Sequence, residues 1–241
     1  DYQGAIADFN MAIEINPQDA FAYTNRGIAK RKSRDLQGAI LDYDKAMEID
    51  PQHVAAYYNR GVIKGRDLGD YQGAISDFNK AIAIDPNLAL VYNNRGLAKD
   101  NLKDYQGAII DYNKAIEINP QNAAAYNNRG AVKSDLKDHQ GAIIDYSKAI
   151  EINPQYAAAY TNRGYVKYEL QDYKGAIADY SKAIEINPQY AAAYYNRGNA
   201  KYNLNDKRGA CADLKKAVSL GDQETAQWLN NADGAWCRNM R

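Results

Sequence analysis

The chain has 241 residues, and its 30 lysine and arginine residues balance its 30 aspartate and glutamate residues. A formal charge of zero argues against nucleic acid or an anionic membrane surface as the main partner, because both are bound chiefly through clustered positive charge. No apolar run reaches the roughly 18 residues that a spanning helix requires, so we expect no membrane insertion.

Proline and glycine recur along the chain with a fixed period. The prolines are separated by 34 or 35 residues: Pro17, Pro51, Pro86, Pro120, Pro154 and Pro188. Most of the glycines form two further series with the same period. A period of this length indicates stacked supersecondary units, each of which buries its apolar face against its neighbours.

Each period contains two stretches with apolar residues at helical spacing, which predicts a pair of helices. Residues 1–16 match only the second helix of a partial repeat. Helix pairs are predicted at 20–51, 54–86, 89–120, 123–154, 157–188 and 191–221. A capping helix is predicted at 222–232, with Trp228 and Leu229 on one side, followed by a tail at 233–241.

The start and the end of each second helix carry recognisable signals. An aspartate recurs three residues before one glycine series, as Asp104 does before Gly107, and we interpret it as the N-cap. The helix is predicted to end at an Asn-Pro or Asp-Pro pair, because the residue before proline disfavours the α region. One extra residue lies between Lys64 and Asp70, in the turn within that repeat.

These helix pairs resemble the tetratricopeptide repeat, a family of 34-residue helix-turn-helix units. In one repeat the motif consists of Tyr126, Gly130, Ala142, Tyr146, Ala149 and Pro154. The resemblance covers residues 1 to about 221. It implies an all-α fold, a right-handed α-solenoid of stacked antiparallel helix pairs, in which the first helices line a concave groove. It also implies a protein or peptide ligand.

An asparagine lies two residues before the glycine of every first helix. The series is Asn25, Asn59, Asn94, Asn128, Asn162 and Asn196. In some arrays of this family the matching asparagines bind the main chain of an extended peptide, and an amide can donate and accept at once. Alternatively, each amide bonds to the adjacent first helix and only spaces the repeats.

Side chains beside this ladder are predicted to supply specificity. Arg31 belongs to a basic N-terminal end of the groove, and the C-terminal end is rich in tyrosine. The candidates are Arg31, Tyr58, Tyr165, Tyr168, Tyr195, Asn199 and Tyr202. Tyrosine offers a large contact area with few rotors and a hydroxyl group, which suits recognition. The alternative is that these rings only pack between adjacent first helices.

An arginine before each first-helix glycine is predicted to pair with an aspartate of the second helix, as Arg129 would with Asp145. Such an ion-pair ladder would fix the register between helices, and its alternative is a set of independent, solvated charges. His53 and His139 are assigned to packing, and Cys211, at the position of Ile143 in another repeat, is expected to be a buried thiol.

The sequence contains no metal-ligand spacing, phosphate loop or nucleophile elbow, so we expect neither enzymatic activity nor a cofactor. The function predicted is a non-enzymatic scaffold that binds an extended peptide or a partner helix. One alternative is a self-assembling module, a homo-oligomer formed through an uncovered N-terminal helix. The other is a substrate-recruiting arm of a larger enzyme. Two cysteines leave the compartment open.

Overall fold

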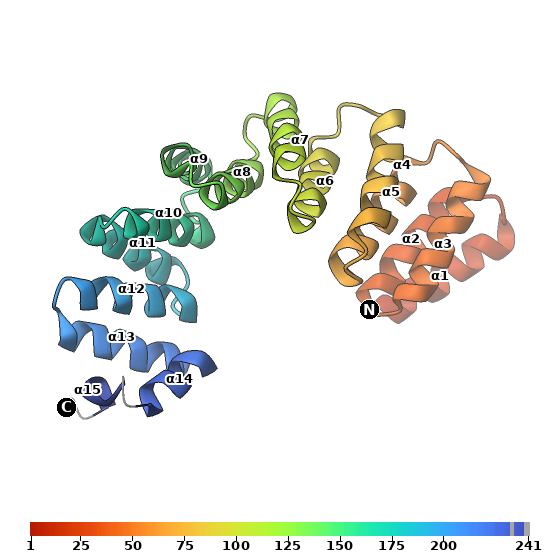
Figure 1. Ribbon diagram of the computed structural model, residues 1–241. Coiled ribbons are helices and arrows are strands. Elements are labelled where there is room, and N and C mark those ends of the chain that lie inside the picture. Colours follow the sequence, from red (N-terminus) through yellow and green to blue (C-terminus); the bar gives the residue numbers. More distant parts are fainter. Residues whose placement is uncertain (232–233, 239–241) are drawn as a thin grey trace. The chain divides into compact units, whose positions relative to one another are not determined.

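The computed structural model describes residues 1–231 and 234–238, and its regular secondary structure within these ranges is helical throughout (Figure 1). The helices stack in antiparallel pairs, which confirms the predicted all-α solenoid. The chain divides into two compact units, Asp1–Pro120 and Gln121–Arg241.

The first unit begins with a single second helix, α1, and continues with three helix pairs. Its helices are α1 (Tyr2–Ile15), α2 (Ala20–Lys32), α3 (Leu36–Ile49), α4 (Val54–Val62), α5 (Tyr71–Ile84), α6 (Ala89–Asn101) and α7 (Tyr105–Ile118). A π-helix, η1 (Ile63–Asp67), extends α4. The extra residue of this repeat therefore lies in a π-helical turn, which accommodates one more residue than an α-helical turn.

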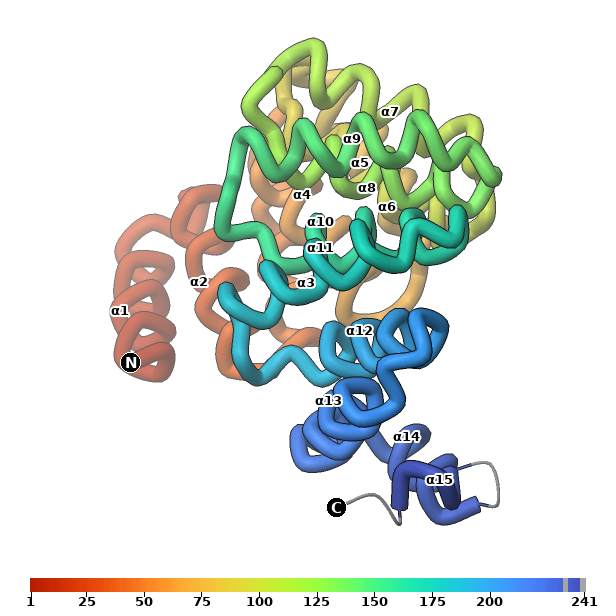
Figure 2. The backbone as a smooth tube through the Cα atoms, turned by 90° about the vertical axis from the view of Figure 1, so that its left-hand side faces the viewer, coloured from red at the N-terminus to blue at the C-terminus, as the bar shows by residue number. Residues whose placement is uncertain are grey.

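The second unit contains three helix pairs and two shorter helices. These are α8 (Ala123–Asp135), α9 (His139–Ile152), α10 (Ala157–Glu169), α11 (Tyr173–Ile186), α12 (Ala191–Asn203), α13 (Lys207–Ser219), α14 (Gln223–Asn230) and α15 (Ala235–Arg238). Figure 2 shows α14 and α15 beside each other, beyond α13.

The predicted N-caps are confirmed. The Asp104 carboxylate accepts a hydrogen bond from the backbone N–H of Gly107 at 3.0 Å, and the other second helices begin in the same way. A Cβ atom on Gly107 would collide with the Asp104 carboxylate. Glycine in this first turn therefore lets the carboxylate cover the free amides, although it lowers helix propensity relative to alanine.

In five of the six helix pairs an aromatic ring of the second helix packs against the glycine of the first helix, and in the last pair Leu214 packs against Gly198. A Cβ atom on Gly96 would lie 2.8 Å from Cε1 of Tyr112, so the absent side chain makes room for the ring. Tyr112 is fully buried, and burial raises the pKa of its hydroxyl well above the usual value. Phe78 occupies the same position in another repeat, so the hydroxyl group is dispensable for this packing.

The predicted ion-pair ladder is confirmed, and its aspartates are buried rather than solvated. Asp145 is 1% exposed and accepts two hydrogen bonds from Arg129, at 2.9 Å from Nε and 2.6 Å from Nη2. Lys133 binds the same carboxylate at 2.8 Å. The other arginine–aspartate pairs are Arg26–Asp42, Arg60–Asp77, Arg95–Asp111, Arg163–Asp179 and Arg197–Asp213.

The C-terminal end differs from the sequence prediction in two respects. The segment predicted as a tail contains α15, and the expected buried thiol of Cys211 is wrong because Cys211 forms a disulfide with Cys237 of α15. The chain folds back after α14 and brings the two Cα atoms within 5.2 Å. Residues 232, 233 and 239–241 of the predicted cap and tail lie outside the described residues.

Removal of one ladder arginine should destabilise the second unit. Arg163→Met leaves Asp179 buried with Lys167 as its remaining charged partner, and we expect the free energy of unfolding to fall by about 2 kcal/mol, below the full cost of an unpaired buried charge. Lys182→Met, which removes an exposed i,i+3 pair with Glu185, is the control and should leave stability nearly unchanged. Equal urea midpoints for the two variants would contradict this account.

Candidate functional site

A cavity in each unit is lined mainly by first helices. The cavity of the first unit, the N-terminal cavity, measures about 660 Å³ and lies along α2, α4 and α6. The cavity of the second unit, the C-terminal cavity, measures about 730 Å³ and lies along α10, α12, α14 and α15. Both volumes fall within the range of about 300–1,000 Å³ that is usual for ligand sites.

The N-terminal cavity contains three of the predicted site residues, Arg31, Tyr58 and Asn94. The hydroxyl oxygen of Tyr58 accepts a hydrogen bond from Nδ2 of Asn94 at 3.0 Å. Burial raises the pKa of Tyr58, and this hydrogen bond and the nearby arginines oppose the rise. Arg31 is paired with Asp67 of η1 at 2.7 Å, whereas Arg66 of η1 is exposed at the cavity. The positive charge of this cavity is therefore partly neutralised.

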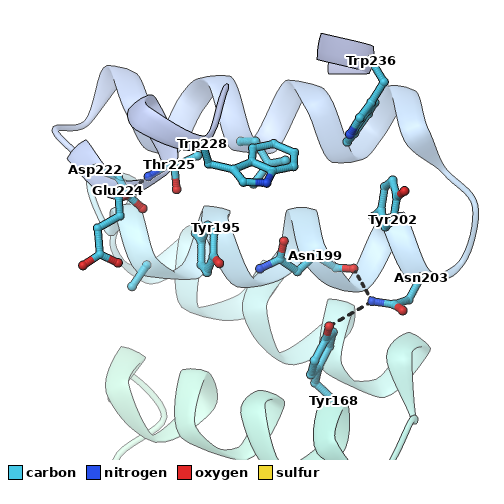
Figure 3. A pocket seen from close by; sticks show the side chains of 12 residues that line it. Tyr168, Tyr195, Asn199, Tyr202, Asn203, Asp222, Glu224, Thr225, Trp228 and Trp236 are labelled. Carbon is cyan, nitrogen blue, oxygen red and sulfur yellow. Dashed lines mark hydrogen bonds between the residues drawn. The ribbon is translucent and has the colours of Figure 1, made fainter. Parts of the chain in front are cut away.

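The C-terminal cavity contains four predicted residues, Tyr168, Tyr195, Asn199 and Tyr202 (Figure 3). Tyr168 projects from α10, and the other three project from α12. The hydroxyl oxygen of Tyr168 accepts a hydrogen bond from Nδ2 of Asn203 at 3.0 Å, which joins two adjacent first helices. Tyr195 and Tyr202 remain 40% and 46% exposed, so their rings are available to a ligand.

Both tryptophans of the chain complete the wall of this cavity. Trp228 comes from α14 and Trp236 from α15, and their ring centroids are 6.1 Å apart. The Trp236 ring also lies 5.1 Å from that of Tyr202. Because the disulfide of Cys237 ties α15 to α13, it holds the Trp236 ring at the cavity.

The ladder asparagines make several different contacts. Asn94 and Asn162 donate across to the adjacent first helix, to Tyr58 and to Oδ1 of Asn127 respectively. At these two positions the amide bonds to the adjacent first helix, which is the contact expected if the asparagine spaces the repeats rather than binding a ligand. Each primary amide has a second N–H and a carbonyl with two lone pairs, so one such bond leaves capacity for a ligand. Asn59 instead donates to the carbonyl of Ala55 in its own helix.

Six predicted residues lie outside the linings of the two cavities. They are Asn25, Asn59, Asn128, Asn162, Tyr165 and Asn196. Sequence reasoning missed Trp228, Trp236, Asp222, Glu224 and Thr225 as cavity residues. The available signal was the chain's two tryptophans, which both fall after the last repeat. Trp228 was predicted only to lie on one side of the capping helix.

The described residues contain no group of three histidine, cysteine, aspartate or glutamate side chains suited to holding a metal ion. None of the described helices combines the length and the apolarity that crossing a bilayer would take. His53 is buried, and its ring packs perpendicular to that of Phe21 at a centroid distance of 4.7 Å, in keeping with the packing assigned to it.

Three family models match the chain. A model described as TPR repeat matches residues 65–100 and 164–205. Two models described as tetratricopeptide repeat match residues 89–122 and 123–156, and residues 22–53 and 191–221. A comparison with curated protein sequences gives no match.

Solved structures of similar fold cover most of the chain. One chain of the crystal structure of the APC/C hetero-tetramer Cut9–Hcn1 aligns with 96% of this chain and 46% of its own length, at a TM-score of 0.79 and 18% identity. YrrB, a TPR protein with an unusual peptide-binding site, aligns with 77% of this chain and 95% of its own, at a TM-score of 0.61 and 26% identity. MamA aligns with 71% of this chain and 93% of its own, at a TM-score of 0.62 and 30% identity.

Opening the disulfide should release α15 without unfolding the repeats. In Cys237→Ser, or under a reductant, we expect faster amide hydrogen exchange in α14 and α15 and altered tryptophan fluorescence, because Trp236 loses its anchor. Helices α8 to α11 should keep their protection, since each repeat contacts only its neighbours. Faster exchange throughout 121–221, or unchanged exchange in α14 and α15, would contradict the local role of this bond.

Proposed function

Because the chain belongs to the tetratricopeptide repeat family, we propose that it is a non-enzymatic scaffold that binds an extended peptide of a partner protein. Proteins of this family are generally non-catalytic and bind proteins or peptides. The peptide would lie along the first helices, with one anchor side chain in the C-terminal cavity.

The composition of the C-terminal cavity carries this proposal. It combines exposed rings, such as Tyr195 and Tyr202, with amide groups of Asn199 and Asn203. Tyrosine and tryptophan are enriched among the residues that carry most of the binding energy at protein interfaces, and their rings offer a large contact area with little loss of conformational entropy. The amide groups can orient a peptide main chain. The peptide-binding description of YrrB, at 26% identity, supports the same class of ligand.

The asparagine ladder is assigned a supporting part in this proposal. A neutral hydrogen bond contributes about 0.5–1.5 kcal/mol net, whereas micromolar binding requires about 8 kcal/mol. The amides of Asn162 and Asn196 would therefore align the peptide main chain, and the aromatic cavity would provide most of the affinity.

Nucleic acid and a second copy of the chain are the other partners to consider. The balanced charge favours a protein partner over nucleic acid. Self-association through α1 is a second candidate, because Met11 and Ile15 are 57% and 87% exposed on that helix. Self-association is a prediction separate from peptide binding. The C-terminal cavity lies in the other unit and does not depend on it.

Truncation of a cavity tyrosine should weaken peptide binding selectively. On a peptide array, Tyr202→Ala should reduce binding at least tenfold, about 1.4 kcal/mol, because the ring lines the C-terminal cavity. Tyr165→Ala is the matched control: its ring is 47% exposed on a neighbouring first helix but lies outside the lining. The same loss in both variants would count against the cavity as the anchor site.

Truncation of the ladder should lower affinity with little effect on which peptides are selected. The double variant Asn162→Ala, Asn196→Ala removes two amides that would contact the main chain, and we expect a loss of about tenfold across all bound peptides. Thermal melting controls for the lost bond between Asn162 and Asn127. Undiminished binding by a stably folded variant would remove the ladder from the mechanism.

A further inference from the structure

The C-terminal cavity gathers aromatic side chains from four helices. Tyr168, Tyr195 and Tyr202 line it from α10 and α12, and Trp228 and Trp236 line it from α14 and α15 (Figure 3). The faces of such rings carry a negative electrostatic potential, and tryptophan attracts a cation most strongly. The chemistry of the rings therefore favours a positively charged or apolar ligand group.

The charged side chains in the lining are all acidic. Asp222 and Glu224 lie together at one end of the cavity, at the start of α14 (Figure 3), and the lining has no lysine, arginine or histidine. Asp222 also accepts the backbone N–H of Thr225 at 3.0 Å as the N-cap of α14. Within the described residues Glu224 makes no ion pair or hydrogen bond through its side chain. A cation at this end would meet two negative charges and no positive one.

A buried hydroxyl group lies in the same part of the lining. Thr225 is 1% exposed, and its Oγ1 atom has no hydrogen-bond partner among the described residues. Figure 3 shows Thr225 beside Asp222 and Glu224. Buried polar groups are nearly always hydrogen-bonded. An unpaired acceptor at the acidic end is therefore a position where an N–H donor of a ligand would gain a bond.

We propose that the C-terminal cavity binds a lysine or arginine side chain of the partner peptide. The cationic group lies at the end formed by Asp222 and Glu224, and the alkyl stem lies along Tyr195 and Trp228. A long basic side chain suits this arrangement, because its stem packs on apolar surface while its charged head reaches polar groups. This inference rests on the proposed function and specifies the class of residue that the peptide carries.

Intrinsic fluorescence provides a direct test, because both tryptophans of the chain lie in this cavity. The probe is the blocked hexapeptide Ala-Ala-Lys-Leu-Ala-Ala, compared with versions in which norleucine or glutamate replaces lysine. We expect the lysine peptide to bind about tenfold more tightly than the norleucine peptide, through the ring and carboxylate contacts together. The glutamate peptide should bind most weakly, and added salt should reduce the preference for lysine.

The double variant Asp222→Asn, Glu224→Gln isolates the contribution of charge. Asparagine also serves as an N-cap, so α14 is expected to remain folded, and circular dichroism checks this. The preference for the lysine peptide over the norleucine peptide should then fall from about tenfold to the smaller part that the rings contribute, about twofold. Equal affinity for the lysine and norleucine peptides in the native chain would overturn the inference and leave peptide binding at the cavity intact.

The absence of any fluorescence change would also bear on the proposed function. If none of the three hexapeptides changes the fluorescence of the native chain, the assignment of a basic side chain to this cavity is overturned. The peptide array with Tyr202→Ala then decides whether the cavity binds other peptides, so failure of the inference and failure of the proposed function are distinguishable.

Discussion

Each helix pair is held together by a buried aspartate that an arginine and a lysine of the first helix clamp. In one repeat, Asp179 receives two hydrogen bonds from Arg163 of the preceding first helix and an ion pair from Lys167 one turn later. Arg163 also donates to Ser147 of the second helix before it, at 3.0 Å. One guanidinium group therefore joins three successive helices. Its planar, five-donor geometry suits this task in a way that a lysine does not.

This clamp determines which face of a first helix is available to a ligand. Arg197 is directed towards Asp213 of α13, whereas Tyr195, Asn199 and Tyr202 of the same helix line the C-terminal cavity. The clamping arginine recurs in every helix pair, whereas the residues at the cavity positions differ from repeat to repeat. A constant clamp with variable groove positions allows one fold to present different ligand chemistry along its length.

Much of the fold was predictable because its determinants are local. The N-cap of Asp104, the helix stop at Pro120 and the arginine–aspartate pairs follow from spacings that repeat every 34 residues. The site was less predictable. Asp222, Trp236 and Cys237 lie beyond the repeat pattern, and the disulfide joins residues 26 positions apart that no periodicity relates. The partner of Asn162 was also open, because an amide at that position can bond either to a neighbouring helix or to a ligand, and in the structure it donates to Asn127.

In the proposed function the first helices bind the peptide and the second helices support them, and amide hydrogen exchange with and without a bound peptide distinguishes these two roles. With the tightest peptide from the array at saturation, we expect slower exchange in α10, α12 and α14, which line the C-terminal cavity. Slower exchange confined to α9, α11 and α13 would contradict it, because the ligand would then lie on the supporting helices.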